Sequence, residues 1–150
     1  MASSQIFKVF CFLICATFYF SCSVSPEPVR YGSDLCQTCK MGIVQKGFAA
    51  EIVTKKGRVY KFDDVGCQIL FFKSAQIKIE DCAHILVLKH GTDQEWIEAN
   101  KAIFITEVQI KSPMNFNYAC YKNNENIPSM YLTSSLNKYN WEEIYSKIGQ

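Results

Sequence analysis

The sequence of 150 residues is about as long as one domain, and a hydrophobic fraction of 49% against a charged fraction of 20% excludes wholesale disorder. The formal net charge of +2 argues against a dedicated nucleic-acid binder, in which a basic excess or stripe is expected. Beyond residue 21 no apolar run reaches the ~18–20 residues of a membrane span, so the body of the chain is not predicted to cross a bilayer.

The first 21 residues have the pattern of a secretory signal peptide. Lys8 is their only charged residue, and an apolar run follows from Val9 to Phe20. A positive start followed by a short apolar run is typical of such signals, whereas a buried helix would show a polar face, which this run lacks. We therefore predict that residues 1–21 are removed from the mature protein.

Cys22 occupies the position expected of a lipidated cysteine. It follows Ser21 at the end of the apolar run, which resembles a bacterial lipobox, although Tyr19 replaces the usual aliphatic residue. Acyl chains anchor a protein through about 0.8 kcal/mol for each buried CH₂ group. Residues 22–34 hold two prolines, three serines and no apolar period, a composition that suits a tether. We predict a lipoprotein signal at 1–21, a lipidated Cys22 with its tether at 22–34, and a domain at 35–150.

The first part of that domain is predicted to form a hairpin, a helix and a strand. Residues 48–54 and 58–62 are strand-like and flank Lys55-Lys56-Gly57, which predicts a β-hairpin with a glycine turn. Asp63-Asp64 is expected to cap a helix, because the apolar residues that follow have helical spacing. Residues 84–89 form the next expected strand.

The second part is predicted to have a similar order. Residues 96–99 and 102–108 are expected to pair as a hairpin, and residues 117–122 to form a strand. Residues 128–139 are expected to form a helix with Pro128 near its first turn, and the sequence WEEIYSKI at the end of the chain a short amphipathic tail. Met41 and Met114 each precede a strand, about 70 residues apart. This spacing is too long for a solenoid and favours two related α+β halves.

The segment from Cys36 to Met41, CQTCKM, places two thiols and a thioether within six residues. Soft sulfur ligands select soft metals, above all Cu(I). No second CxxC completes a structural zinc site, and Lys40 stands where a c-type haem site needs histidine. A disulfide, plain free thiols and a redox pair remain alternatives, because spacing alone does not separate them from a metal site.

Three other positions are candidates for chemistry. The segment FDDVGC at residues 62–67 has two interpretations: an acidic N-cap, which we favour, or a Cys67 thiol whose pKa is lowered at a helix start. Met114 lies in a polar loop and could be an exposed ligand. His84 and His90 could offer nitrogen ligands, although a structural role is favoured for both.

Taken together, these elements resemble the NosL family. The resemblance is carried by CQTCKM at 36–41, the Ala49-Ala50 strand, FDDVGC at 62–67, Trp96 and the loop Ser112–Met114, in family order behind a lipoprotein signal. It implies an α+β fold of two similar ββαβ halves packed as one compact unit, related to the repeat in organomercurial lyase. It also implies a copper-binding accessory lipoprotein encoded with nitrous oxide reductase, and not an enzyme.

With the resemblance included, we predict a Cu(I) site formed by Cys36 and Cys39 and completed by Met41 or Met114. The expected partners are nitrous oxide reductase or its copper-site assembly machinery, and the expected location is the bacterial cell envelope, lipid-anchored and facing the periplasm. Five cysteines remain after processing, so they cannot all pair within one chain. Cys82 and Cys120 have no assigned role.

Three alternatives remain open at the sequence level. One is a thiol-disulfide oxidoreductase that uses the CxxC pair, and another is a surface lipoprotein whose sulfurs are only structural. The third is a carbon–metal lyase, which would need paired cysteines and a carboxylate to converge. Asp63, Asp64 and Cys67 are close in sequence, but spacing does not show whether they reach Cys36 and Cys39.

Overall fold

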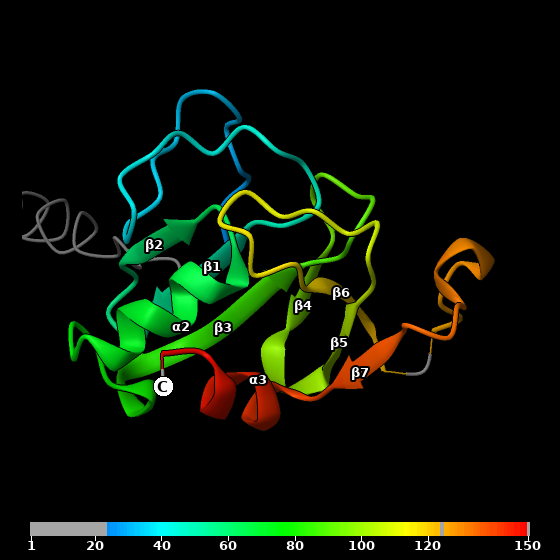
Figure 1. Ribbon diagram of the computed structural model, residues 1–150. Helices are drawn as coiled ribbons and strands as arrows, with labels where there is room; N and C mark the ends of the chain where they lie inside the picture. Colours follow the sequence, from blue (N-terminus) through cyan, green and yellow to red (C-terminus); the bar gives the residue numbers. More distant parts are fainter. Residues whose placement is uncertain (1–23, 124, 150) are drawn as a thin grey trace, which may run out of the picture.

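The fold is α+β, and the described part of the chain forms two antiparallel sheets and two α-helices (Figure 1). A computed structural model describes residues 24–123 and 125–149 of the chain. The first sheet has the order β2-β1-β3-β4, and the second has the order β6-β5-β7. The strands are β1 (Ala50–Thr54), β2 (Val59–Phe62), β3 (Cys82–Leu88), β4 (Trp96–Glu98), β5 (Ala102–Thr106), β6 (Ala119–Lys122) and β7 (Asn137–Tyr139).

Helix α2 (Val65–Lys73) covers one face of the first sheet, and helix α3 (Trp141–Lys147) follows β7 (Figure 1). The rings of Tyr60 and Phe62 on β2 lie 5.1 and 5.4 Å from that of Phe71 on α2, which identifies the covered face. Short 3₁₀ turns span Ile79–Asp81, Ala99–Lys101 and Ser129–Tyr131. In the described part of the chain, no helix has the length and apolar character needed to cross a membrane.

Several elements predicted from the sequence are confirmed. β1 and β2 form the expected antiparallel hairpin, and β3 pairs with β1. Asp64 is the N-cap of α2, since its side chain accepts a hydrogen bond from the Gly66 N–H at 2.8 Å. At the other end of the domain, Asn140 and Glu143 form a capping box that starts α3.

The predicted second hairpin is wrong. β4 pairs with β3 in the first sheet, whereas β5 pairs with β6 and β7 in the second. The 3₁₀ turn at Ala99–Lys101 separates the two strands and directs them into different sheets. The short polar break at Asn100-Lys101 is therefore a crossing point between sheets and not a hairpin turn.

The predicted helix over 128–139 is also wrong. The segment holds one 3₁₀ turn, Ser129–Tyr131, and then β7. Met130 and Leu132 are 60% and 59% exposed, so the segment has no buried apolar face of the kind that stabilises a helix by packing. The order ββαβ is present in β1, β2, α2 and β3, but the described second half lacks an α-helix between its strands, and a two-half symmetry is not confirmed.

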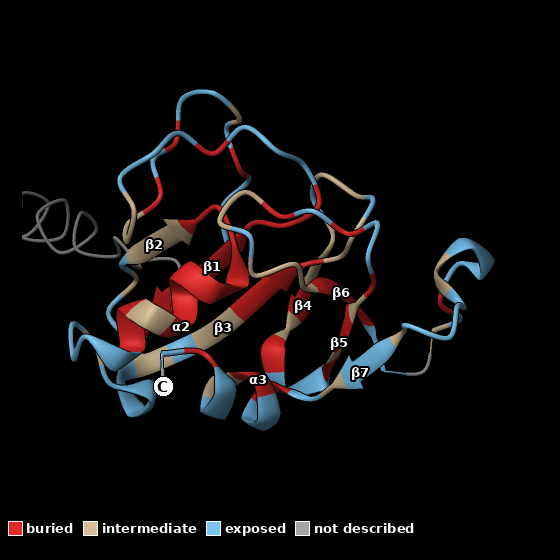
Figure 2. Cartoon of the chain, viewed as in Figure 1, coloured by how far each residue is buried: buried red, intermediate tan, exposed pale blue. Residues whose placement is uncertain are grey.

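One core joins the two sheets and both helices, as the buried parts of β1, α2, β3 and β5 show in Figure 2. It includes Phe62 from β2, Ile69 from α2, Phe104 from β5 and Ile144 from α3, all fully buried. A smaller cluster lies under the loops of the second sheet and includes Phe48, Ile105 and Tyr121. Because the main core crosses between the sheets, they form one packed unit.

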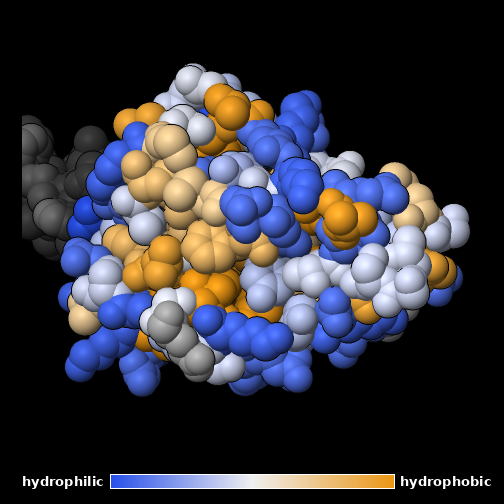
Figure 3. Space-filling view, in the orientation of Figure 1, coloured by the Kyte–Doolittle hydropathy of each residue, from blue (hydrophilic) through white to orange (hydrophobic). Residues whose placement is uncertain are grey.

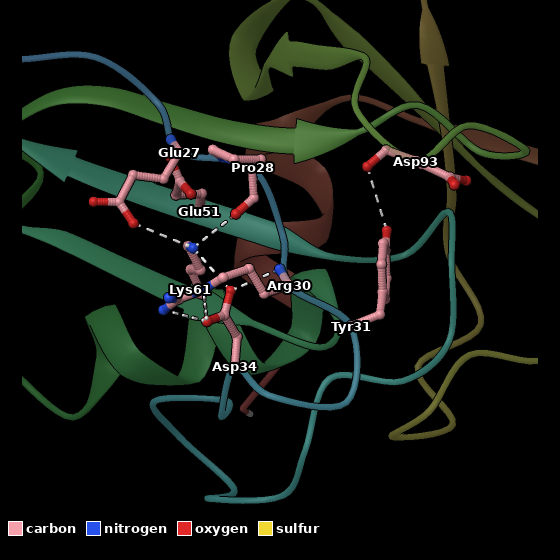
Figure 4. Close-up of polar contacts among 8 residues, drawn as sticks. All are labelled: Glu27, Pro28, Arg30, Tyr31, Asp34, Glu51, Lys61 and Asp93. Atoms are coloured by element: carbon pink, nitrogen blue, oxygen red, sulfur yellow. Dashed lines mark hydrogen bonds and ion pairs between the residues drawn. The ribbon is translucent and has the colours of Figure 1, made fainter.

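The segment before the CxxC turn lies against the other face of the first sheet (Figure 4). The Lys61 ammonium donates to the Pro28 carbonyl at 2.9 Å and to Asp34 at 2.8 Å, and it lies 3.2 Å from Glu27. The Glu27 N–H donates to Glu51 at 3.0 Å. Residues 27–34, within the span assigned to a tether, are therefore held against β1 and β2. Residues 1–21 and Cys22 lie outside the described residues.

We expect Glu51 to make stability pH-dependent. Burial raises the pKa of its carboxyl from 4.5 to about 7, against the lowering effects of the Glu27 N–H and Lys61. At pH values between 4.5 and about 7, the Glu51 carboxyl therefore holds its proton more tightly in the folded chain than in the unfolded chain. The contribution of Glu51 to the free energy of unfolding is therefore fully present below pH 4.5 and falls by about 3 kcal/mol as the pH rises to about 7.

The measurement is urea unfolding of the parent and Glu51→Gln proteins across this pH range. We expect the variant to lack this component of the pH dependence and to be the more stable protein at pH 8, because no charge is then buried at residue 51. Glu80→Gln, at an exposed position, is the control. Parallel pH profiles for the parent and Glu51→Gln would contradict the assignment.

Candidate metal centre

A compact turn presents the CxxC pair. Leu35 and Gly42 form an isolated antiparallel bridge at its base, and the Cys36 N–H donates to the Met41 carbonyl at 2.8 Å. The Lys40 N–H donates to the Cys36 carbonyl at 3.0 Å, with Lys40 in the left-handed region at a φ of 64°. These bonds are local, so the residues of the turn determine the proximity of the two thiols.

The start of α2 supplies the other half of the site. Asp63 precedes the Asp64 N-cap, and Cys67 lies in the first turn of the helix. The Thr38 hydroxyl donates to the Cys67 carbonyl at 2.7 Å, which joins the CxxC turn directly to the helix. The Gln37 N–H also donates to the Lys61 carbonyl at 2.8 Å, which fixes the turn beside β2.

Four side chains converge where the turn meets the helix. The sulfurs of Cys36, Cys39 and Cys67 and a carboxylate oxygen of Asp63 all lie within 4.8 Å of one another. All but Cys39 are buried. Sulfur–metal distances of about 2.3 Å place two ligands of one tetrahedral ion about 4 Å apart, so small shifts would bring these atoms onto a single ion.

The donor set suits a metal that prefers sulfur. Cys39 donates its thiol hydrogen to Asp63 Oδ2 at 3.4 Å, while Asp63 Oδ1 is buried without a hydrogen-bond partner. A buried carboxylate oxygen without a partner is costly unless a cation or donor satisfies it. Three sulfurs and this oxygen therefore fit a soft or borderline ion such as Cu(I) or Zn(II).

The three thiols of the cluster have different proton affinities. The Cys67 thiol donates to Cys36 and, together with the backbone N–H groups of Asp63 and Cys39, lowers the pKa of Cys36 to about 6. The same hydrogen bond, followed by burial, raises the pKa of Cys67. The pKa of Cys39 is raised to about 11, mainly by burial and to a smaller extent by the negative charges of Cys36 and Asp63.

The hydrogen bond from Cys67 therefore favours the thiolate form of Cys36 over the thiolate forms of Cys39 and Cys67. For Cys67 the direction is opposite to the alternative interpretation from the sequence, because the hydrogen bond to Cys36 and burial raise its pKa. A metal that binds all three sulfurs must displace the protons of Cys39 and Cys67. All five cysteines within the described ranges are free thiols, so no disulfide blocks this chemistry there.

A second loop, residues 112–117, packs on the start of α2. The Ser112 hydroxyl donates to Asp64, and the Asn117 N–H donates to the Ser112 hydroxyl at 2.8 Å. Burial raises the pKa of the Asp64 carboxyl overall. The Met114 N–H also faces this carboxylate and has a smaller, lowering effect on its pKa. Asp64 thus caps the helix and also holds the loop that carries Met114.

The two methionines predicted as ligands flank the cluster. Met41 follows the CxxC turn, its N–H faces the Cys39 sulfur, and its side chain is 50% exposed. Met114 is partly buried and packs against the core that contains Cys36 and Cys67. Both loops therefore lie next to the four converging groups, and thioether binding by Met41 and Met114 stays a prediction.

Neither histidine belongs to the cluster found among the described residues. His84 lies on β3 and pairs with Glu98 at 2.6 Å. His90 sits among Phe48, Tyr121 and Tyr131, and its Nε2 lies 3.2 Å from the Tyr131 hydroxyl. These contacts agree with the structural roles favoured from the sequence.

Sequence reasoning did not assign Cys67 and Asp63 to the site. The signal was present in FDDVGC, but the residues lie 24 or more positions after Cys39. Their approach depends on the β-hairpin, which returns the chain to the CxxC turn just before α2 begins. Cys82 and Cys120 lie elsewhere. Burial and nearby acidic groups raise the pKa of Cys82 to about 11, and burial raises that of Cys120.

We expect Gly66→Ala to displace the second loop. A Cβ atom at residue 66 would lie 2.1–2.4 Å from carbons of the Phe116 ring, so the ring and its loop must move. The expected loss of unfolding free energy is about 1–3 kcal/mol, typical of overpacking, and thermal unfolding measures it. Gly42→Ala is the matched control, because a Cβ there meets only Val44, at 3.9 Å.

The double variant Gly66→Ala, Phe116→Ala tests the cause. Once the Phe116 ring is removed, Gly66→Ala should change the free energy of unfolding very little. The effects of the two substitutions on this free energy are therefore expected to be strongly non-additive. Additive effects, or a Gly66→Ala protein as stable as Gly42→Ala, would show that the ring does not hold the loop in this way.

The fold and site define an α+β domain with a buried cluster of three cysteines and an aspartate that could hold a metal ion. The NosL family pattern matches residues 30–128, which include the whole cluster and both methionine loops. The chain belongs to the NosL family. A search of curated protein sequences finds no match. The family and the cluster together support a copper-binding accessory role.

Proposed function

We propose that this protein is a Cu(I)-binding metallochaperone, anchored to the membrane, that delivers copper for the maturation of nitrous oxide reductase. The observation that supports it most is the approach of three cysteine sulfurs and the Asp63 carboxylate to within 4.8 Å in a NosL domain. Soft thiolates select Cu(I) over harder ions. The recipient is the reductase or its copper-site assembly machinery, and the protein carries no catalytic activity of its own.

In this proposal Cys36, Cys39 and Cys67 capture the ion as thiolates, while Met41 or Met114 supplies a neutral thioether. Cys36 is the one thiol of the three whose pKa is lowered, so it loses its proton most readily and is the natural first ligand. A thioether binds more weakly than a thiolate, and it leaves the ion exchangeable. Met41 is exposed and Cys39 is partly exposed, whereas Cys36 and Cys67 are buried, and we propose that exchange with a partner takes place on the side of Cys39 and Met41.

The test is a competition titration of the reduced, metal-free protein with a calibrated Cu(I) chelator and, separately, with a Zn(II) chelator. We expect one Cu(I) per chain, bound far more tightly than Zn(II), with an affinity that weakens as the pH falls because protons compete for the thiolates. Equal preference for the two ions would leave a metal site but remove the case for a dedicated copper carrier.

Enzymatic alternatives require separate assays. An insulin-reduction assay tests for a thiol-disulfide oxidoreductase. The convergence of Cys36, Cys39 and Cys67 with Asp63 also meets the geometric requirement for protonolysis of a carbon–metal bond, so incubation with an organomercurial tests that activity. Turnover in either assay at a rate above that of the Cys36→Ser, Cys39→Ser protein would contradict the non-enzymatic role.

The membrane anchor is proposed to be a lipid on Cys22. Cys22→Ser is expected to release soluble protein or to leave uncleaved precursor, since the modified residue is lost. Metabolic labelling with a radioactive or alkynyl fatty acid measures this, and continued labelling of the variant would refute the assignment. An anchor would raise the effective concentration of the carrier near membrane-bound partners.

A further inference from the structure

Exposed apolar side chains lie close to the CxxC turn in the chain. Leu35, Met41 and Val44 are 62%, 50% and 69% exposed. Leu35 pairs with Gly42 at the base of the CxxC turn, Met41 directly precedes Gly42, and Val44 follows two residues after it. Figure 3 shows apolar surface running from the loops that precede β1 down over α2. Isolated apolar residues on a surface are ordinary, but a contiguous group beside an exchange site indicates contact with another molecule.

The charged side chains at the tip of the turn and in the hollow beside it are lysines. Lys40 is exposed at the tip of the turn, between Cys39 and Met41. Beside the turn lies a hollow of about 660 Å³ that contains Lys40 and Lys73 and no carboxylate. It is lined by Gln37, Thr38, Lys40, Leu70, Phe71, Lys73, Ser74 and Gln76. The nearby carboxylates Asp34, Asp63 and Asp64 are buried and cannot offset these lysines at the surface.

We propose that this surface, defined as Leu35, Lys40, Met41, Val44 and the hollow with Lys73, is the docking site for an acidic protein that exchanges copper with the cluster. We call it the docking face. The copper chemistry of this inference rests on the proposed function. The two lysines steer and orient a negatively charged partner, and the apolar side chains exclude water around the half-buried Cys39.

The arrangement favours a protein partner that brings its own sulfur ligand. Lys40 and Met41 are exposed and directly follow Cys39 in the chain, so a partner held by them would bring its ligand close to the sulfur that would release the ion. Exchange then needs no free copper. Carboxylates on the partner pair with Lys40 and Lys73 and determine its orientation.

The test uses two synthetic peptides with the same Met-x-x-Met core, one flanked by glutamates and one by lysines. Binding of each metal-free peptide to the apo protein is measured by calorimetry and by amide chemical shifts. We expect the acidic peptide to bind at least about tenfold more tightly at low salt, with shifts at the docking face, and the difference to shrink as salt screens the charges.

Charge reversal supplies the control. The double variant Lys40→Glu, Lys73→Glu should abolish or invert the preference for the acidic peptide. The control is the double variant Lys56→Glu, Lys138→Glu, which reverses the same charge at exposed positions outside the docking face. It should keep the preference. Leu35→Ser, Val44→Ser should weaken binding of both peptides equally. Equal binding of the two peptides, or an unchanged preference after reversal at Lys40 and Lys73, would overturn the inference.

Two further measurements separate this inference from the others. Because the peptides and the protein are metal-free, the binding result stands whether or not the protein holds Cu(I), and Cu(I) affinity is measured independently. Co-sedimentation with vesicles of anionic phosphatidylglycerol tests a membrane as the occupant. Vesicle binding that is lost in Lys40→Glu, Lys73→Glu, without a preference for the acidic peptide, would assign the surface to lipid and reject a protein partner.

Discussion

Replacing Cys36 and Cys39 together with serine is expected to lower the Cu(I) affinity by on the order of 100-fold or more. Loss of groups that only orient a metal ligand costs about 10–100-fold in affinity, and here two of the three thiolates are lost. Cys67→Ser alone should be the most damaging single thiol substitution after Cys36→Ser, because Cys67 is buried and shares a hydrogen bond with Cys36. Competition against a Cu(I) chelator measures each affinity.

Two variants that leave Cys36, Cys39 and Cys67 intact serve as controls for these Cu(I) affinities. Cys82→Ser removes a thiol that lies outside the cluster and should leave the affinity unchanged. Met114→Leu should reduce the affinity less than any cluster cysteine, since a neutral thioether contributes less than a thiolate. Full Cu(I) affinity in the double serine variant would show that copper binds elsewhere on the chain.

Phe104→Ala is expected to lower the free energy of unfolding by about 3–5 kcal/mol, the usual cost of truncating a buried aromatic side chain. Phe104 is fully buried on β5, 6.1 Å from the Trp141 ring of α3, and belongs to the core that includes residues of the first sheet. Such a loss is a large fraction of the 5–15 kcal/mol typical of a folded protein. Urea unfolding measures it.

The same experiment tests whether the two sheets unfold together. Because the core crosses between them, we expect one cooperative unfolding transition for the parent and one for Phe104→Ala. Near- and far-ultraviolet circular dichroism should give the same transition midpoint for each protein. Val108→Ala, at a position that is 69% exposed, is the control and should shift the midpoint little. Two separate transitions, or a loss as small as that of Val108→Ala, would contradict a shared core.

The parts of the fold that were predicted correctly have short-range causes. Lys55-Lys56-Gly57 turns the chain between two strands, and Asp64 caps the next helix. Each signal acts within a few residues, so the local sequence contains the reason for the structure. The proximity of Cys36 and Cys39 has the same origin, since one tight turn holds both.

The errors arose where a partner distant in sequence decides the outcome. β4 and β5 follow each other closely, yet they pair in different sheets because the free edges available to them are on β3 and β6. In the segment 128–139, Pro128 is a residue typical of the first turn of a helix. The segment nevertheless lies at the edge of the second sheet, where β7 pairs with β5. It has no buried apolar face that would stabilise a helix.

For the candidate site, the sequence by itself determined the sulfur-rich turn, the capped helix and the membership in a recognisable family. Only the tertiary structure decided that Cys67 and Asp63 join Cys36 and Cys39, and that a hydrogen bond from Cys67 lowers the pKa of Cys36. The physical reason is that metal ligands need proximity in space, which the β1–β2 hairpin and its packing against α2 supply. Proton affinities likewise depend on burial and hydrogen bonds, which exist only once the chain is folded.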